Sequence, residues 1–293
     1  MTSFELVEPR SLEETFALLD RDDPAVRPIA GGTALMLMMK SGLFSPLRLI
    51  SLRRVEPRLA GIAFADGSVR IGAMTTFAAL EHSPEIRRHL PVVTRTMRTL
   101  ANPRVRNVAT VGGNLAHADT HLDLPLVWIA LGAQAVVVSP RGERIVAVED
   151  LYRGYYETVL HHDELIAALH VPLRPTWRSV YVKVTTRTAH DWPALGIAVS
   201  LARDGSIIRD ARIAVGAATK KATRLIQAET VLRGAAIDAA AVDDALLARA
   251  GDAAIGEISI EADSRGSASY KQHLLRVYLG RAVRAAAAAE PGA

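Results

Sequence analysis

The chain has 293 residues, of which 49% are hydrophobic, enough to build one large domain or two to three smaller ones. It contains no cysteine, which excludes disulfides, thiolate nucleophiles and cysteine-held iron–sulfur or zinc centres within this polypeptide. Its formal net charge is +4, from 35 basic and 31 acidic residues that read as mixed along the sequence. This balance gives no argument for nucleic acid, so we expect no nucleic-acid partner.

The first residues do not show the charged and apolar segments of a signal peptide. No uninterrupted apolar run approaches the length that spans a bilayer. We therefore expect a cytoplasmic protein.

Residues 1–57 alternate between helical and extended patterns. We predict a helix at 11–19, a strand at 27–29, a Gly-Gly turn, a helix that ends near Lys40 and a strand at 48–51. Thr33 is expected to cap the second helix. This alternation predicts a small parallel α/β unit, which forms the first domain.

Residues 58–174 have a different pattern. A hairpin is predicted from strands at 62–64 and 69–71, joined by Asp66-Gly67. Helices follow from Thr75 or Thr76 and from Ser83-Pro84, and the second has an irregularity at Pro91. Strands are predicted at 135–138 and 145–148. The second domain is therefore expected to be α+β.

Two prolines within residues 172–176 predict a linker, after which a third domain covers 175–293. It should contain a three-stranded antiparallel sheet followed by helices, with an exposed loop before the last helix. The predicted strands are 180–185, 196–202 and 211–215, the helices 222–233, 239–250 and 270–289, and the loop 251–269. The expected fold class is α+β.

Two Gly-Gly pairs, at 31–32 and 112–113, each lead toward a predicted helix start. Glycine lets the backbone take positive φ and approach a ligand closely, and a helix start offers free N–H groups to a phosphate. Each pair alone also fits an ordinary structural turn. Together they suggest a diphosphate held from two sides. Asp123 precedes an early helical proline and could cap the helix that follows.

Other chemistries find less support. His117, Asp119, His121 and Asp123 alternate like metal ligands. The residues between them form no convincing core face, and a dedicated metal site usually recruits ligands from elsewhere too, so we expect no metal site. The dinucleotide-binding and P-loop glycine patterns are absent, and no hydrolytic triad can be grouped. A nucleotide would have to be bound by another architecture.

In order and spacing, residues 30–33, 107–114 and 123–125 resemble the FAD-binding medium subunits of molybdenum hydroxylases. This family includes the flavoprotein subunits of carbon monoxide dehydrogenase and of bacterial relatives of xanthine dehydrogenase. Residues 71–76, 181–183 and Asp191 extend the resemblance over nearly the whole chain. It implies a two-part FAD-binding region and a smaller C-terminal domain.

The resemblance also implies which residues contact the cofactor. Asp123 corresponds to an acid that hydrogen-bonds the flavin nucleotide, while Lys183 and Trp192 correspond to positions near the isoalloxazine. Ala34 stands where many relatives have Ser or Asp, which removes a side-chain hydrogen bond there. The implied contacts are Ile29, Ala30, Gly31, Gly32, Thr33, Ala34, Leu35, Met36, Leu100, Thr110, Gly112, Gly113, Asn114, Asp123, Ile166, Lys183 and Trp192.

Within such a family the chemistry is divided among subunits. A large subunit would carry the molybdenum cofactor, a small subunit two [2Fe–2S] clusters, and this chain FAD, which passes electrons to an external acceptor. The implied assembly is a dimer of heterotrimers. Its acceptor could be a quinone, NAD or another carrier, and only a quinone would bring it to a membrane. The substrate cannot be read from this chain. The alternatives are a self-sufficient flavoenzyme, a flavin-free structural subunit and a nucleotide-binding regulator.

Overall fold

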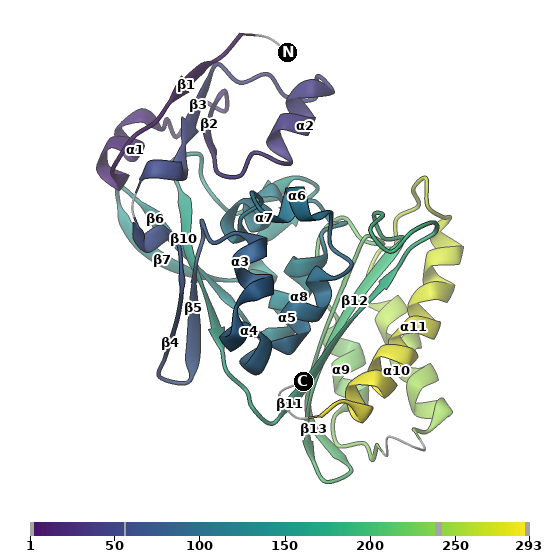
Figure 1. Ribbon diagram of the computed structural model, residues 1–293. Helices are drawn as coiled ribbons and strands as arrows, with labels where there is room; N and C mark the ends of the chain where they lie inside the picture. The colour runs from purple at the N-terminus through teal and green to yellow at the C-terminus, as the bar shows by residue number, and fades with distance from the viewer. Residues whose placement is uncertain (1–2, 56, 238–241, 291–293) are drawn as a thin grey trace.

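The computed structural model describes residues 3–55, 57–237 and 242–290, whose main elements form three sheets with their helices (Figure 1). The first sheet is parallel, in the order β1-β3-β2, and confirms the predicted α/β unit. Strand β1 was not predicted. The elements are β1 (Glu5–Val7), α1 (Leu12–Leu18), β2 (Val26–Ile29), α2 (Leu35–Lys40) and β3 (Arg48–Ser51).

A local side-chain cap explains where the first helix of this unit begins. The Ser11 side chain accepts a hydrogen bond from the Glu14 backbone N–H at 3.0 Å, which satisfies one free donor of the first turn of α1. One face of the unit packs against the second sheet, because Leu165 and Ala167 of that sheet belong to the same buried cluster as Leu12 and Ile50.

The second sheet has five antiparallel strands in the order β4-β5-β10-β6-β7. The predicted turn at Asp66-Gly67 is present, and both residues have positive φ, as a tight hairpin requires. The strands are β4 (Ile62–Ala65), β5 (Ser68–Gly72), β6 (Gln134–Ser139), β7 (Gly142–Ala147) and β10 (Leu165–Pro172).

Six helices lie between β5 and β6 along the chain. Thr76 and Ser83 cap α3 and α4, and Pro91 separates α4 from α5, as the sequence predicted. These helices are α3 (Phe77–His82), α4 (Pro84–His89), α5 (Pro91–Met97), α6 (Pro103–Arg106), α7 (Val111–His117) and α8 (Asp123–Leu131). The short elements are η1 (Leu52–Arg54), η2 (Pro57–Leu59), η3 (Val148–Asp150), β8 (Tyr152–Gly154) and β9 (Glu157–Thr158).

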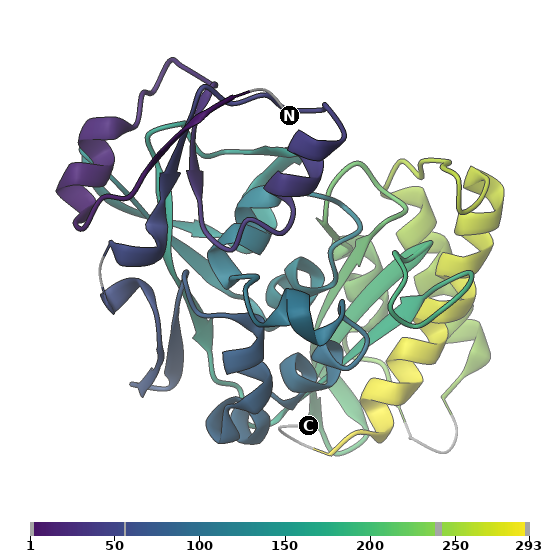
Figure 2. The ribbon, with the colours of Figure 1, turned by 45° about the horizontal axis from the view of Figure 1, so that its top comes forward.

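The C-terminal unit is an antiparallel sheet in the order β11-β12-β13-β14. Three strands were predicted, and the fourth has only two residues. Figures 1 and 2 show this sheet between the helices of the second unit and α9–α11. Its elements are β11 (Trp177–Val184), β12 (Leu195–Asp204), β13 (Ile207–Gly216), β14 (Thr223–Arg224), α9 (Ile226–Leu232), α10 (Asp244–Gly256) and α11 (Ala268–Ala288).

The prediction of an exposed loop over residues 251–269 was wrong for residues 251–256. Helix α10 continues to Gly256, because Leu247, Ala250 and Ala254 extend a buried stripe. Asp263 is exposed, as predicted, and forms an ion pair with the fully buried Lys271 at 2.8 Å. The predicted helix start at 239 lies outside the described residues, and α10 begins at Asp244.

Helix α8 joins the second and third units. All nine of its residues are buried, as expected of a helix that is apolar on every side. Leu126 packs on Gly196 of β12 and Gly216 of β13, where an added Cβ would lie 2.8 and 3.1 Å from its methyl groups. The missing side chains therefore let the helix approach the sheet closely.

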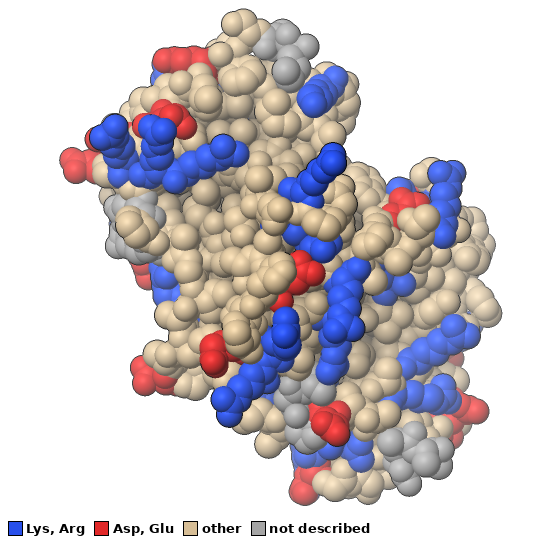
Figure 3. All heavy atoms as spheres, in the orientation of Figure 1, with Lys and Arg blue, Asp and Glu red and all other residues tan. Residues whose placement is uncertain are grey.

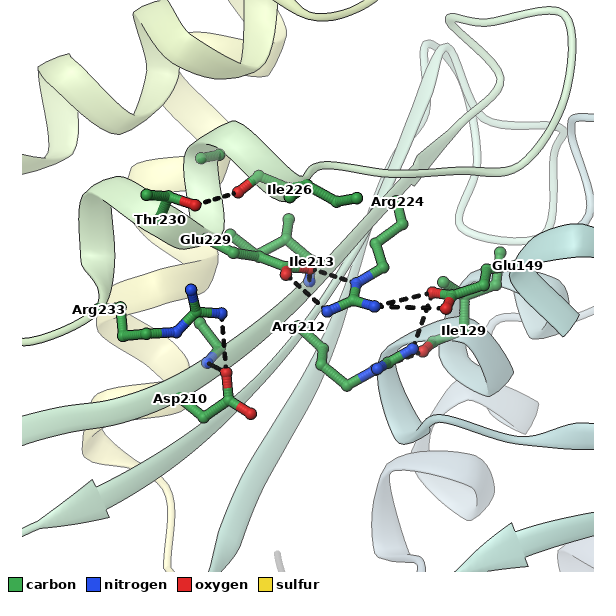
Figure 4. Close-up of polar contacts among 12 residues, drawn as sticks. Ile129, Glu149, Asp210, Arg212, Ile213, Arg224, Ile226, Glu229, Thr230 and Arg233 are labelled. Atoms are coloured by element: carbon green, nitrogen blue, oxygen red, sulfur yellow. Dashed lines mark hydrogen bonds and ion pairs between the residues drawn. The ribbon is translucent and has the colours of Figure 1, made fainter. Parts of the chain in front are cut away.

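A network of ion pairs ties the same two units together (Figure 4). Arg212 and Arg224 of the C-terminal sheet both reach Glu149, at 2.9 and 3.1 Å. Arg224 also forms a two-pronged pair with the buried Glu229, which in turn accepts from the backbone of Ile213. Such bidentate pairs fix both distance and orientation.

Candidate functional site

A cleft of about 590 Å³ is lined by residues of all three units. Its volume lies within the range that small-molecule and cofactor sites occupy. Every residue that the resemblance implied as a cofactor contact lines this cleft except Met36, which instead lies under the Gly32 turn. The structure thus brings together positions spread from residue 29 to residue 192.

The first glycine segment follows the end of β2. Gly32 has a φ of +72°, which L side chains rarely adopt. A Cβ on Gly31 would overlap the carbonyl oxygen of Val108 and lie 2.7 Å from its carbonyl carbon. Both glycines are therefore required by the backbone, one for its conformation and the other for a close approach.

The main chain of this segment is rich in unused donors. Among the described residues, no partner is found for the backbone N–H groups of residues 31–34. Helix α2 follows without a side-chain cap: its N-cap is Ala34, and the predicted cap by Thr33 is wrong. Unpaired N–H groups that face a cleft attract an anion such as a phosphate.

The second glycine segment is built differently. Gly112 and Gly113 lie in the first turn of α7, not in a turn of positive φ as predicted. Their N–H groups are already paired, with the Ala73 carbonyl at 2.8 Å and the capping Thr110 hydroxyl at 3.2 Å. Glycine is needed because a Cβ on Gly112 would lie 2.5 Å from the Ala73 methyl group.

The two segments contact each other across the floor of the cleft, where a Cβ on Gly113 would lie 3.7 Å from that of Ala30. Next to them the buried side-chain oxygen of Asn114 has no partner among the described residues. A buried polar atom without a partner is costly unless a ligand or water satisfies it. This residue therefore fits a cleft that holds a hydrogen-bonding ligand.

A buried charge network lies behind the second segment. Lys183 of β11 contacts Asp123 at 3.0 Å and the carbonyl of Thr99 at 3.1 Å, and Tyr181 donates to the other oxygen of Asp123. Burial raises the pKa of Asp123 above its ordinary value, and Lys183 opposes this rise. The N-cap of α8 is Leu122, so the predicted capping role of Asp123 is wrong.

The His-Asp alternation of residues 117–123 has a structural role that the sequence did not reveal. Asp119 accepts hydrogen bonds from the backbone and the ring of His121, at 2.9 and 2.8 Å. Burial raises the pKa of Asp119, but these bonds outweigh it and hold the pKa below its ordinary value. His121 also reaches Asp263 at 3.2 Å, which links the second unit to the third.

Aromatic rings surround this His121 network at the mouth of the cleft. The Trp192 ring stacks on His121, with centroids 5.2 Å apart and planes 20° apart, and the guanidinium of Arg265 lies 5.3 Å from the Trp192 ring centroid. Tyr156 donates to Asp119 at 3.3 Å, and burial raises the pKa of Tyr156 to about 12. Trp192 is 49% exposed and belongs to no core cluster.

Several cleft residues were missed because no local pattern marked them. Met74 lies just after β5 and Phe44 after α2, and only the fold brings their apolar side chains to the cleft. His162 is also there, with a buried ring nitrogen that has no partner in the described part of the chain. Burial lowers the pKa of His162, and so does the nearby Arg27, another lining residue.

Comparison with known proteins identifies the family to which this architecture belongs. Residues 2–174 match the family described as the FAD binding domain in molybdopterin dehydrogenase, and residues 180–286 match the CO dehydrogenase flavoprotein C-terminal domain. Fold and site thus define a flavin-binding subunit. The chain belongs to the family of FAD-binding medium subunits of molybdenum hydroxylases.

Individual relatives cover nearly the full length. The carbon monoxide dehydrogenase medium chain of Afipia carboxidovorans is 35% identical over 98% of this chain and 97% of its own. The nicotine 6-hydroxylase medium subunit of Paenarthrobacter nicotinovorans is 35% identical over 94% of each chain. The solved carbon monoxide dehydrogenase of Hydrogenophaga pseudoflava superposes with a TM-score of 0.91, at 34% identity and 97% coverage of both chains.

Membership fixes the cofactor and the division of labour. The chain binds FAD and works as the flavoprotein component of an oxidoreductase, while the molybdenum and iron–sulfur centres belong to partner subunits. The absence of cysteine agrees with that division. Among the described residues, no helix is both long and apolar enough to cross a membrane.

Proposed function

We propose that the cleft holds FAD with its diphosphate on the free N–H groups of residues 31–34 and its isoalloxazine toward Lys183 and Trp192. The four unpaired donors carry this proposal, because the matching groups of the second segment are already used. Charge-assisted hydrogen bonds to an anion are about twice as strong as neutral ones. Thr110 and Asn114 complete the opposite wall.

The remaining roles follow from position. Leu100 and Ile166 are buried side chains of the cleft wall and would exclude water from the cofactor. Asp123 and Lys183 form a fixed charge pair at the start of α8, which orients their hydrogen bonds toward the nucleotide. Bound FAD supplies the redox chemistry, since it accepts electrons from the iron–sulfur partner and passes them to an external acceptor.

The proposal extends to the assembly. We infer three domains at 1–57, 58–174 and 175–293, and a cytoplasmic complex that is a dimer of heterotrimers and contacts a membrane only where its acceptor is a quinone. The support is the medium-subunit family itself, whose members belong to complexes with large and small partners. The native mass of the complex, measured by light scattering, tests the stoichiometry.

Removal of one donor tests the diphosphate site. Ala34 has a φ of −84°, close to the value that proline imposes, so Ala34→Pro deletes an N–H group at small conformational cost. One charge-assisted bond is worth about 1.5–3 kcal/mol, so we expect FAD to bind roughly 10- to 100-fold more weakly. Ala34→Gly keeps the N–H group, adds no side-chain donor and is the control.

Flavin fluorescence measures the affinity, and thermal unfolding of the apoprotein shows whether each variant folds. Riboflavin, which has no phosphate, should bind both variants equally. If Ala34→Pro binds FAD as tightly as Ala34→Gly does, the diphosphate does not lie on this segment.

A further inference from the structure

The positive charge of the chain is concentrated in one segment, contrary to the sequence-based description of mixed charges. Residues 77–106 contain six arginines, no lysine and two glutamates, which gives 6 − 2 = +4. The whole chain has 35 − 31 = +4, so all other residues together sum to zero. The segment comprises α3 to α6 and their connections.

Five of these arginines are exposed, namely Arg87, Arg88, Arg95, Arg98 and Arg104. None of the five has an ion pair or side-chain hydrogen bond within the part of the chain that the structure describes. The sixth, Arg106, pairs with Glu81 at 2.8 Å, and the other acid, Glu85, pairs with His89 at 3.4 Å. The surface therefore has no internal counter-charge, unlike the arginine network at the domain joint (Figure 4).

Figure 3 shows Lys and Arg side chains gathered in a band over the α4, α5 and α6 helices. This arginine face, which we define as the five exposed arginines, borders the cofactor cleft. Leu100 and Val105, from the same segment, line the cleft, and the exposed Val108 provides the carbonyl against which Gly31 packs. A protein docked on the face would therefore lie next to the bound cofactor.

We propose that the arginine face is the docking surface for an acidic surface of the iron–sulfur partner subunit. The inference rests on the proposed function, because electrons must reach FAD from that partner. Guanidinium groups form two-pronged bonds with carboxylates and lose less hydration than ammonium groups when an interface closes. An uncompensated positive face also steers an acidic partner and sets its orientation.

Charge reversal tests the face in the assembled complex. Arg95→Glu/Arg98→Glu should lower the amount of iron–sulfur subunit that co-purifies with the tagged chain at least tenfold. Arg10→Glu/Arg249→Glu changes the net charge equally at two exposed side chains that have no ion pair among the described residues. These two residues lie outside residues 77–106, and this control should assemble like the wild type.

Salt provides a second measurement on the same samples. Screening shortens the electrostatic range from about 10 Å at 0.1 M salt to about 3 Å at 1 M salt. Assembly of the wild type should weaken over this range, and assembly of the face variant should depend less on salt. The iron–sulfur subunit is identified by its own [2Fe–2S] absorption and by its mass.

Cross-linking identifies what the face touches. Arg98→Lys and Arg104→Lys keep the charge and add an amine, which a zero-length carbodiimide joins to a carboxylate in contact with it. A cross-link to an Asp or Glu of the iron–sulfur subunit supports the proposal. Cross-links to a second copy of this chain or to the molybdenum subunit overturn it. Unchanged assembly of the charge-reversed variant also overturns the proposal. The same holds if the only defect of that variant is lost binding to DNA or anionic vesicles.

FAD content separates this proposal from the one on which it rests. The charge-reversed variant should retain FAD, and dithionite, a small reductant that needs no docking, should reduce it at the wild-type rate. If wild type and variant both lack FAD, the proposed function fails. If FAD is retained while the partner still binds normally, only the docking proposal fails.

Discussion

The two Gly-Gly segments look alike in sequence but have different roles in the structure. Gly31-Gly32 forms a turn with positive φ ahead of an uncapped helix, and its N–H groups are free. Gly112-Gly113 lies inside the first turn of a helix capped by Thr110, and its N–H groups are paired within the protein. The first segment can offer a ligand its main chain, and the second offers side chains and a close surface.

This difference shows that a pair of glycines can be required for several separate reasons. A positive φ, a close contact with backbone and a close contact with a helix each exclude Cβ, and the sequence does not tell them apart. The comparison predicts different consequences for substitutions that look equivalent. Variants at the two segments therefore test it.

The largest effect is expected where Cβ has no room. In Gly31→Ala the methyl group would overlap the Val108 carbonyl, and in Gly112→Ala it would press on Ala73. Overpacking costs up to about 3 kcal/mol, and Gly31→Ala should approach this value because backbone cannot rotate away. Urea unfolding of the apoproteins measures the loss. Equal stability of both variants and wild type would show that the segments separate easily.

Asp123→Asn should have the next largest effect. The amide can keep the hydrogen bond from Tyr181, but Lys183 loses its buried counter-charge. The unfolding free energy should fall by about 2 kcal/mol, and FAD affinity should fall with it, because Asp123 and Lys183 both line the cleft. Asp150→Asn, which changes an exposed acid at the end of η3 that has no ion pair among the described residues, is the control and should leave both values unchanged.

Gly32→Ala and Gly113→Ala separate strain from ligand contact. Alanine at the Gly32 φ of +72° costs about 1–2 kcal/mol of stability. In α7 alanine is a better helix former than glycine by roughly 0.8–1.0 kcal/mol, which offsets its contact with the Thr110 hydroxyl, so Gly113→Ala should leave stability nearly unchanged. Its methyl group points toward Ala30, into the gap between the segments, and should weaken FAD binding. If Gly113→Ala lowered stability and Gly32→Ala lowered only FAD affinity, the roles assigned to the two segments would be wrong.

The sequence predicted most elements where local signals are strong. Asp66-Gly67, the capping Thr76 and Ser83, and Pro91 each determine their own turn, cap or break. Nothing local marks β1, because it is three residues long and is held by its pairing with β3. The same limit hid the link from His121 to Asp263, 142 residues apart.

The cleft was predictable because the resemblance supplied positions that spacing alone would not have joined. The reason for each position was not predictable. Asp123 looked like a helix cap, since Asp before Pro has that local role, but its real partners lie on β11, some 60 residues later. Met36 follows the glycine turn directly, yet it packs beneath that turn instead of lining the cleft.

The smallest stability effect is expected for Trp192→Ala, which tests whether the cleft mouth belongs to the cofactor or only to the protein. Trp192 is 49% exposed and contacts His121 and Arg265, so its removal should change the unfolding free energy by less than about 1 kcal/mol. It should shift the flavin absorption envelope and change reoxidation by the acceptor, while reduction by the iron–sulfur partner stays the same.

Trp177→Ala is the matched control, because Arg174 covers that ring at 4.4 Å and Trp177 does not line the cleft. The control should leave the flavin spectrum unchanged. A large stability loss in Trp192→Ala with an unaltered spectrum would mean that the stacked pair with His121 braces the fold and that the isoalloxazine lies elsewhere.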